Sequence, residues 1–373
     1  MPLILIMLGV FIMAEFAVKG NNARFKRFFE KAEQGGKLTV AFLGGSITMG
    51  CHATTEDKRY VNRIFSHLCE LFPKAELTLV NGGIGATTSQ FGAARLDDDI
   101  LRFEPDMVFV EFSVNDDNNI KSFQETFESC IRRILSYKTQ PACMVINNLF
   151  YDTGFNAQEI HNEAAAYYGV PAVSVRDYDW PRLQSGELKR DDLTADGLHP
   201  NDKGMQIIAM LVNEALDQLF EEPADEQISV PEKTLTKARY VNAKRFDARS
   251  LVPELAGFVR DPDPQRDITD VFKNGWISTG SGAVFKAELK AEIICVQWRR
   301  TIARPAPIAR AVIDGDIANA VTLDANFEED WGDLLCLTTV YESKKADKHT
   351  IEIIVDDQPD SSVPFYLVSI ITA

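Results

Sequence analysis

Apolar and polar positions alternate along residues 37–220 in a pattern that predicts strands separated by helices. Short apolar runs, typical of buried parallel strands, lie at residues 38–43, 77–80, 107–112, 144–149 and 171–175. Apolar residues recur at helical spacing in residues 60–72, 122–136, 157–168 and 202–220. Such a βαβα series predicts a parallel sheet with helices on both faces, a three-layer α/β/α domain.

The pattern changes after residue 220. Residues 221–235 are polar and contain Pro223 and Pro231, as a linker would. From residue 236 to 373, runs of alternating polarity are separated by Asp, Gly and Pro clusters, without a strong helical pattern. We therefore expect a second domain that is an all-β sandwich.

Residues 1–36 precede the first predicted strand, and residues 2–14 are almost entirely apolar. This run is shorter than the about 20 residues that span a bilayer. It also lacks the preceding Lys or Arg and the following small-x-small site of a secretory signal. Two interpretations stay open: a segment packed on the domain, or an export or anchoring signal. We expect a cytoplasmic protein, with export as the alternative.

The chain has 373 residues and a formal net charge of −16. This charge disfavours nucleic acid and anionic membrane surfaces as partners, and we expect no membrane insertion. The six cysteines form no CxxC pair and show no metal-ligand spacing with the histidines. The acidic stretches at 260–267 and 314–316 do not match a calcium loop. We expect no metal and no cofactor.

Four polar motifs lie where predicted strands end or where the last helix begins. GGSIT (44–48), NGGIGATTS (81–89) and SVND (113–116) each follow a strand, and DGLHP (196–200) precedes the last helix. The carboxyl ends of parallel strands share one edge of a sheet, and ligands bind there. Each motif alone is commonplace turn chemistry. Together and in this order they predict a catalytic site.

The residue types in these motifs suit nucleophilic acyl transfer. Ser46 needs a base to take its proton, and a histidine imidazole such as that of His199 can do so at neutral pH. Asp196 can reach the other ring nitrogen if Gly197 allows a tight turn, and would then set the tautomer. The side-chain amide of Asn115 and backbone amides could stabilise an oxyanion. No serine lies in a G-x-S-x-G motif, which argues against the α/β-hydrolase elbow.

These four motifs, in this order, resemble those of the SGNH (GDSL-like) hydrolase family over residues 37–220. The resemblance implies a flavodoxin-like sheet, an esterase activity without a cofactor, and oxyanion donors from the serine, the second motif and the asparagine. The roles implied for this chain fall on Ser46, Gly85 or Ala86, Asn115, Asp196 and His199.

One departure bears on the substrate. The family usually has an aspartate before the serine, whereas this chain has Gly45, a variant associated with carbohydrate-acting members. A β-sandwich beside the hydrolase domain resembles carbohydrate esterases with a jelly-roll module. We therefore expect a serine esterase that removes small acyl groups, most plausibly acetyl, from a saccharide. The alternatives are a non-catalytic carbohydrate-binding or interaction protein, or a thioesterase or lysophospholipase.

Aromatic residues follow the fourth and fifth predicted strands. Tyr151 and Trp180 could stack on a sugar ring, or could equally be core or lid residues. We expect His52 to be an exposed loop residue. For His67 and His161 we expect packing or solvation, and His349 has no visible partner in the sequence.

Overall fold

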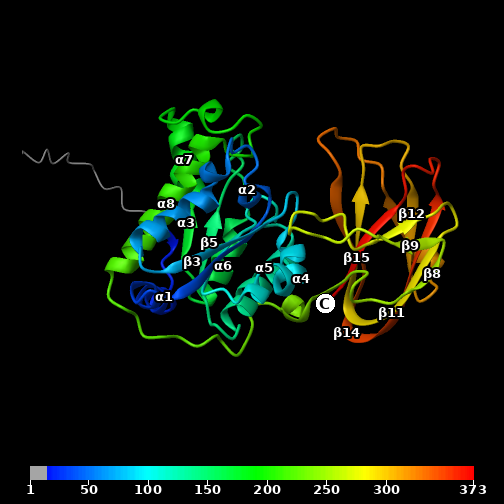
Figure 1. Ribbon diagram of the computed structural model, residues 1–373, viewed down its shortest axis with the longest axis horizontal. Helices are drawn as coiled ribbons and strands as arrows, with labels where there is room; N and C mark the ends of the chain where they lie inside the picture. Colours follow the sequence, from blue (N-terminus) through cyan, green and yellow to red (C-terminus); the bar gives the residue numbers. More distant parts are fainter. Residues whose placement is uncertain (1–14) are drawn as a thin grey trace, which may run out of the picture.

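The computed structural model describes residues 15–373, which form an α/β unit and an all-β unit side by side (Figure 1). The apolar run at residues 2–14 lies outside the described residues, so neither interpretation of it is tested. Within residues 15–373, no helix combines the length and the apolarity needed to span a bilayer. All six cysteines are free thiols.

The α/β unit is built on a six-stranded sheet with the order β1-β6-β5-β4-β2-β3. Its strands are β1 (Phe16–Val18), β2 (Lys37–Gly44), β3 (Glu76–Gly83), β4 (Met107–Glu111), β5 (Ala142–Asn147) and β6 (Ala172–Ser174). Strands β2 to β6 pair in parallel, as predicted. The sheet is not wholly parallel, however, because β1 pairs with β6 in the antiparallel direction. This short strand covers a sheet edge that would otherwise be open.

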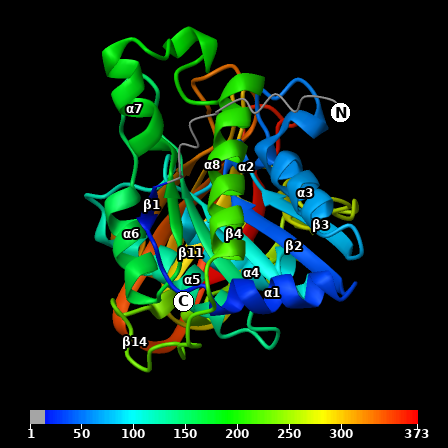
Figure 2. The same cartoon turned by 90° about the vertical axis from the view of Figure 1, so that its left-hand side faces the viewer.

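Helices cover both faces of the sheet (Figure 2). Alternate residues of each strand point to opposite faces, so Val40 and Phe42 pack against α1, α3 and α8, whereas Ala41 and Leu43 pack against α4, α5 and α6. The helices are α1 (Ala23–Glu33), α2 (Ser46–Met49), α3 (Tyr60–Leu71), α4 (Ser89–Asp99), α5 (Lys121–Leu135), α6 (Gln158–Tyr167), α7 (Val175–Ser185) and α8 (Asp202–Glu221). Short 3₁₀ turns lie at η1 (Glu56–Lys58), η2 (Leu101–Phe103), η3 (Arg190–Asp192), η4 (Arg239–Asn242) and η5 (Ile317–Asn319).

Three of the longer helices were absent from the sequence-based expectation. In α4 the buried side includes Ser89, Arg95 and Asp99, so the helix shows no clean apolar stripe. Helix α7 contains Pro181, which is unusual in a helix interior. The phenylalanines of α1 do follow a helical spacing that the sequence could have revealed.

The strand order places the predicted motifs at a topological switch point. Omitting β1, the order β3-β2-β4-β5-β6 is that of flavodoxin-like sheets. The chain leaves β2 towards one side of the sheet and β4 towards the other, so their following loops diverge. A crevice forms between such loops, and ligands bind there.

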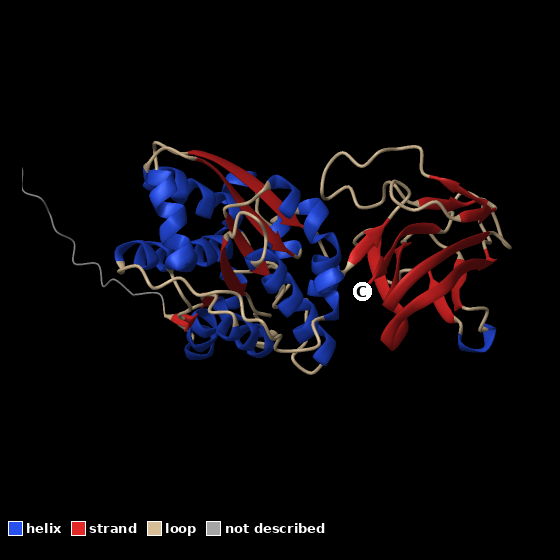
Figure 3. Cartoon of the chain, turned by 90° about the horizontal axis from the view of Figure 1, so that it is seen from below, coloured by secondary structure: helices blue, strands red, loops and turns tan. Residues whose placement is uncertain are grey.

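The β unit is an antiparallel sandwich, as predicted (Figure 3). Its main strand order is β13-β12-β14-β11-β15-β10-β9, with β7 beside β15 and β8 beside β11. The strands are β7 (Lys244–Phe246), β8 (Glu254–Ala256), β9 (Phe258–Arg260), β10 (Trp276–Ser278), β11 (Val284–Arg300), β12 (Ile308–Ile313), β13 (Val321–Asp324), β14 (Leu334–Asp357) and β15 (Tyr366–Thr372). A core that includes Trp276, Phe285 and Ile353 fills the space between the layers.

The chain between α8 and η4 has no helix or strand, but it is held along the α/β unit. Asn22 accepts from the backbone of Asp225, and Glu128 accepts the backbone N–H groups of Leu235 and Thr236. Arg132 donates to the carbonyl oxygen of Pro231. The predicted boundaries at residues 220 and 236 stay a prediction.

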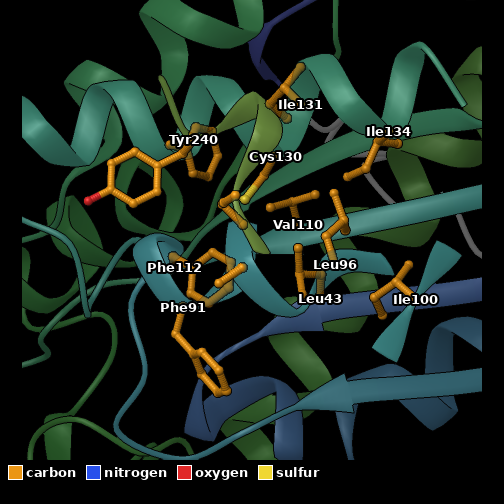
Figure 4. Close-up of a cluster of buried hydrophobic side chains, with 14 of the residues drawn as sticks. Leu43, Phe91, Leu96, Ile100, Val110, Phe112, Cys130, Ile131, Ile134 and Tyr240 are labelled. Atoms are coloured by element: carbon orange, nitrogen blue, oxygen red, sulfur yellow. The ribbon is translucent and has the colours of Figure 1, made fainter. Parts of the chain in front are cut away.

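The two units share an apolar cluster (Figure 4). Tyr240 belongs to it together with Phe91 of α4, and Tyr366 and Val368 of β15 join from the sandwich. Leu367 of the same strand belongs to the sandwich core, so β15 is buried on both faces. This contact supports α4, whose first turn follows the second polar motif.

Candidate active site

Ser46 lies where β2 ends and the short helix α2 begins. The side chain is almost fully buried, at 6% exposure. Because Ser46 is the first residue of α2, its backbone N–H has no acceptor within the helix and is available to a ligand. Gly83 of the neighbouring strand β3 permits this placement of α2. A Cβ at Gly83 would lie only 2.1 Å from the backbone nitrogen of Met49. Only glycine lets α2 approach β3 so closely.

Ser46, His199 and Asp196 form a continuous chain of hydrogen bonds. Ser46 Oγ lies 2.8 Å from His199 Nε2, and His199 Nδ1 lies 2.6 Å from Asp196 Oδ2. The site brings together the end of β2 and the loop before α8, which are 153 positions apart in the sequence. This geometry is that of a Ser–His–Asp triad, in which the imidazole accepts the serine proton.

Asp196 is held in an environment that favours its ionised form. Burial raises the pKa of Asp196, but hydrogen bonds from the side chain and backbone of His199 and from the backbone of Leu198 outweigh burial and hold it well below its usual value. Its Oδ1 accepts the N–H of Leu198 at 2.9 Å and that of His199 at 2.8 Å. An ionised Asp196 keeps a proton on His199 Nδ1 and leaves Nε2 free to act as a base.

A tight turn allows Asp196 to reach back to His199. Gly197 has a φ of +81°, in the left-handed region that glycine tolerates best. Its N–H donates to Thr194 Oγ1 at 3.1 Å, and its carbonyl oxygen accepts the N–H of Tyr151 at 2.8 Å. The tight turn that was predicted at Gly197 is therefore present, and hydrogen bonds to both its N–H and its carbonyl oxygen hold it.

Asn115 lies against Gly45, next to Ser46. A Cβ at position 45 would lie 2.3 Å from Asn115 Oδ1, so any other residue would push the asparagine away. This contact is a physical reason for glycine at the position where the family usually has aspartate. Asn115 Oδ1 is buried and has no hydrogen-bond partner among the described residues. A half-turn of the amide exchanges Oδ1 and Nδ2, so the side chain can present a donor at this point.

The second motif brings Gly85 and Ala86 to the same place. A Cβ at Gly85 would lie 3.9 Å from Ser46 Cβ. Ala86 has a φ of +55°, which is uncommon for a residue with a side chain. Neither N–H has an acceptor among residues 15–373. Both stay candidates for the second oxyanion donor.

A buried carboxyl group between α2 and the third motif was missed in the sequence. Glu111, the last residue of β4, accepts from Ser113 Oγ at 3.2 Å and from Thr48 Oγ1 at 3.4 Å. Thr48 also contacts Tyr60 Oη at 2.7 Å. Burial raises the pKa of Glu111 to about 7 despite these hydrogen bonds. Glu111 thus links the helix that carries Ser46 to the loop that carries Asn115. A lone glutamate inside the apolar run MVFVEF was the available signal.

Two other buried charged residues, Arg95 and Asp116, hold the surrounding loops. Arg95 donates to the carbonyl oxygen of Gly44 at 3.1 Å, one turn from its ion-pair partner Asp99. Asp116 contacts His161 Nε2 at 3.0 Å and accepts the N–H of Ser89 at 3.0 Å. The residue after Asn115 therefore ties the third motif to the start of α4.

His52 is exposed, as predicted, but it does not lie apart from the site. Its Nε2 is 3.9 Å from Asp196 Oδ2, and its ring centroid is 5.2 Å from that of His199. The ligand atoms of these three residues all lie within 4.8 Å of one another, and among the described residues they form the one group compatible with a metal ion.

Tyr151 is not placed to stack on a sugar. Its ring belongs to the core of the α/β unit, the residue is 3% exposed, and its N–H bonds to the carbonyl oxygen of Gly197. Trp180 is partly buried, with its ring over Gly154, and its stacking role stays a prediction. His349 does have a partner, since its Nδ1 lies 2.7 Å from Asp314 Oδ2.

A cavity of about 400 Å³ opens beside α2, between the two units. The α/β unit contributes Met49, Cys51 and Arg59 to its lining. Thr269 comes from the segment between β9 and β10, which reaches across from the sandwich (Figure 1). The sandwich therefore contributes to the surface next to α2, the helix that begins with Ser46.

Comparisons with known proteins identify a family and similar solved structures. A model of the GDSL-like lipase/acylhydrolase family matches residues 42–207. A solved two-domain esterase (CEX) active on acetylated mannans, co-crystallized with mannopentaose, is 39% identical over 96% of this chain and 96% of its own, with a TM-score of 0.92. A second structure of a two-domain esterase (CEX) active on acetylated mannans is 40% identical over 96% of both chains, also with a TM-score of 0.92. No curated protein matches the chain.

Proposed function

Because the chain belongs to the GDSL-like lipase/acylhydrolase family, the SGNH hydrolases, we propose that it is a carbohydrate acetyl esterase that acts on acetylated mannan. The observation that carries the esterase activity is the chain of hydrogen bonds from Ser46 through His199 to Asp196. The likeness to the acetylmannan esterase extends through the sandwich, whose Thr269 lines the cavity beside α2. This supports a substrate that contacts both units.

In the proposed first step, Ser46 Oγ attacks the acetyl carbonyl carbon while its proton passes to His199 Nε2. The negative charge that develops on the carbonyl oxygen is stabilised by the N–H of Ser46, a backbone N–H of Gly85 or Ala86, and the amide of Asn115. The bond to the sugar oxygen then breaks, and that oxygen takes the proton from His199. Acetyl-Ser46 and a free sugar hydroxyl result.

In the second step, a water molecule attacks acetyl-Ser46 and gives its proton to His199 Nε2. The bond between the acetyl carbon and Ser46 Oγ breaks, the serine recovers its proton from His199, and acetate leaves. Asp196 stays ionised throughout and stabilises the imidazolium form of His199. None of these steps requires a metal or a cofactor.

The first experiment measures acetate release from acetylated mannan and from p-nitrophenyl acetate. Ser46→Ala and His199→Ala are expected to lower kcat on the order of 10⁴- to 10⁶-fold. Ser185→Ala, which changes an exposed serine of α7, serves as the matched control and should keep full activity. Undiminished activity of Ser46→Ala would overturn the assignment.

A second experiment locates the nucleophile directly. A sulfonyl fluoride should add one adduct to the peptide that contains Ser46, and labelling should slow as the pH falls because a protonated imidazole cannot accept the serine proton. An adduct on another serine would contradict the proposed triad. Substrate binding without acetate release would instead favour a non-catalytic protein, and activity that rises with acyl chain length would favour a thioesterase or lysophospholipase.

A further inference from the structure

His52, Asp196 and His199 form a cluster of metal-binding side chains on the outer side of the proposed triad. His52 Nε2 lies 3.9 Å from Asp196 Oδ2, the same oxygen that contacts His199 Nδ1 at 2.6 Å. The side chain of His52 is 42% exposed and that of Asp196 is 40% exposed, so an ion can reach both from solvent. The proposed mechanism uses Asp196 and His199 but gives no role to His52.

The backbone holds His52 in this position. Two residues earlier, Gly50 ends α2, and Cys51 donates its N–H to the carbonyl oxygen of Ser46 at 3.0 Å. His52 itself has a φ of +67°, a left-handed conformation that is uncommon for residues with side chains but that histidine adopts more readily than most.

The loop is also anchored after His52. Thr54 donates its N–H to Asp202 Oδ1 at 2.8 Å and its hydroxyl to Asp202 Oδ2 at 2.7 Å. Lys58 contacts the same carboxylate at 2.8 Å. Asp202 begins α8, only a few residues after His199, so the loop that carries His52 is attached next to the loop that carries the base. The cluster is therefore largely preformed.

These donors suit a borderline transition-metal ion. Two imidazoles and one carboxylate are common ligands of Zn²⁺, which binds nitrogen and oxygen at about 2.0–2.2 Å and can complete its coordination with water. Ca²⁺ and Mg²⁺ prefer sets of oxygen ligands, which this cluster does not offer. From this cluster we propose an inhibitory site for Zn²⁺, held by His52 Nε2, Asp196 and His199 Nδ1.

The inhibition follows from the chemistry of imidazole and rests on the proposed role of His199 as the base. Catalysis needs the proton on Nδ1 and the lone pair on Nε2. An ion on Nδ1 uses the lone pair of that nitrogen, so the proton of the neutral ring must move to Nε2. Nε2 then faces Ser46 as a donor and cannot accept the serine proton. The ion also takes Asp196 away from its contact with His199.

The kinetic experiment titrates Zn²⁺ into the full-length enzyme with p-nitrophenyl acetate in a non-coordinating buffer. We expect wild-type enzyme to be inhibited, EDTA to restore its activity, and Mg²⁺ to have no effect. His52→Asn keeps a residue that tolerates the left-handed backbone and removes the imidazole. It should retain basal activity and need at least about tenfold more Zn²⁺ for half-inhibition.

Cys51→Ser is the matched control, because a neighbouring thiol is the obvious competing ligand. It should be inhibited like the wild type. Equal Zn²⁺ sensitivity in wild type and His52→Asn would overturn the site, as would a loss of sensitivity in Cys51→Ser alone.

Calorimetry with ZnCl₂ separates this inference from the proposed function. Ser46→Ala cannot turn over, yet it retains the three ligands and should bind one Zn²⁺ per chain. Adding His52→Asn to that variant should weaken binding at least about tenfold. If wild-type enzyme shows no esterase activity, the proposed function fails while this binding result still stands. If Ser46→Ala binds no Zn²⁺, the inference fails whatever the activity.

Discussion

Two histidine–aspartate pairs in the α/β unit have similar hydrogen bonds but very different surroundings. His199 contacts Asp196 at 2.6 Å, and His161 contacts Asp116 at 3.0 Å. The side chain of His199 keeps 21% of its surface exposed, whereas both members of the second pair are fully buried. A close histidine–aspartate contact therefore does not by itself identify a catalytic pair.

The two pairs differ in which ring nitrogen of the histidine does not contact the aspartate. His199 bonds the aspartate through Nδ1, so Nε2 faces Ser46 Oγ. His161 bonds through Nε2, and its Nδ1 is buried beside the ring of Phe127 without a hydrogen-bond partner among residues 15–373. We infer that the first pair serves chemistry and the second holds α6, α4 and the third motif together. The predictions below test this contrast.

The largest expected effect is on catalysis at the exposed pair. Asp196→Asn should lower kcat on the order of 10⁴-fold, because the amide favours the wrong tautomer of His199. The midpoint of thermal unfolding should change little, since the pair is partly solvated. Steady-state kinetics and a thermal melt of the same preparation check both parts. A small loss of kcat would remove the distinction between the two pairs.

The next effect is on stability at the buried pair. His161→Leu keeps a similar volume but leaves Asp116 without its partner, so the free energy of unfolding should fall by about 3–5 kcal/mol. Urea denaturation measures this change. The folded fraction should retain kcat within about tenfold, because the N–H of Asn115 still bonds to the carbonyl oxygen of Phe112 at 2.9 Å. A stable variant with a kcat loss like that of Asp196→Asn would place His161 in the catalytic machinery instead.

Glu111, a third carboxyl group of the α/β unit, allows the same contrast in burial to be tested through the pH dependence of stability. Burial raises the pKa of Glu111 from 4.5 to about 7, opposite in direction to that of Asp196. Between these values the folded state keeps a proton that the unfolded state releases, so stability falls as the pH rises from 4.5 to about 7. This contribution is up to about 3 kcal/mol.

Glu111→Gln should therefore be more stable than wild type at pH 8, by up to about 3 kcal/mol, and equal to it near pH 4.5. Denaturant titrations across this range provide the measurement. Asp179, whose pKa burial also raises to about 7, is unchanged in both proteins, so its contribution cancels. A stability difference that does not vary with pH would argue against ionisation of Glu111 as the cause.

The smallest expected effect is at a surface pair. His67 Nε2 lies 2.7 Å from Asp217 Oδ1, with side chains 24% and 46% exposed. His67→Ala should lower the free energy of unfolding by less than about 1 kcal/mol and leave kcat unchanged, because solvent screens such pairs. Urea denaturation of both proteins in low and in high salt measures this difference in the free energy of unfolding. A loss comparable to that of His161→Leu would show that burial is not what separates the pairs.

Local patterns predicted much of the fold and of the candidate site. The five parallel strands are visible as short apolar runs, since a strand buried on both faces tolerates few polar residues. Ser46, Asn115 and the Asp196–His199 pair could be found because each follows a strand or precedes a helix at a recognisable place. Helix α4 could not be found in this way, because its buried side carries polar residues, one of which, Arg95, bonds to the distant carbonyl oxygen of Gly44.

Contacts between distant segments were the part that the sequence left open. For Tyr151 both a sugar-stacking role and a core position were possible, and the folded chain places its ring in the core. His52 was expected to be an exposed loop residue and is exposed, but Asp202 also anchors its loop next to His199. Neither contact has a local signature, because each joins residues far apart in the chain.

Hydrophobic periodicity and turn residues act over short distances, so the residue types at the strand ends and their order could be predicted from the sequence. The protonation state and the partner of each polar group, in contrast, depend on the folded chain. Desolvation and hydrogen bonding depend on every element packed around a side chain, so Glu111 and Asp196, both carboxylic acids, have pKa values shifted in opposite directions. For the same reason, His199 faces a serine and His161 a phenylalanine, although each is paired with an aspartate.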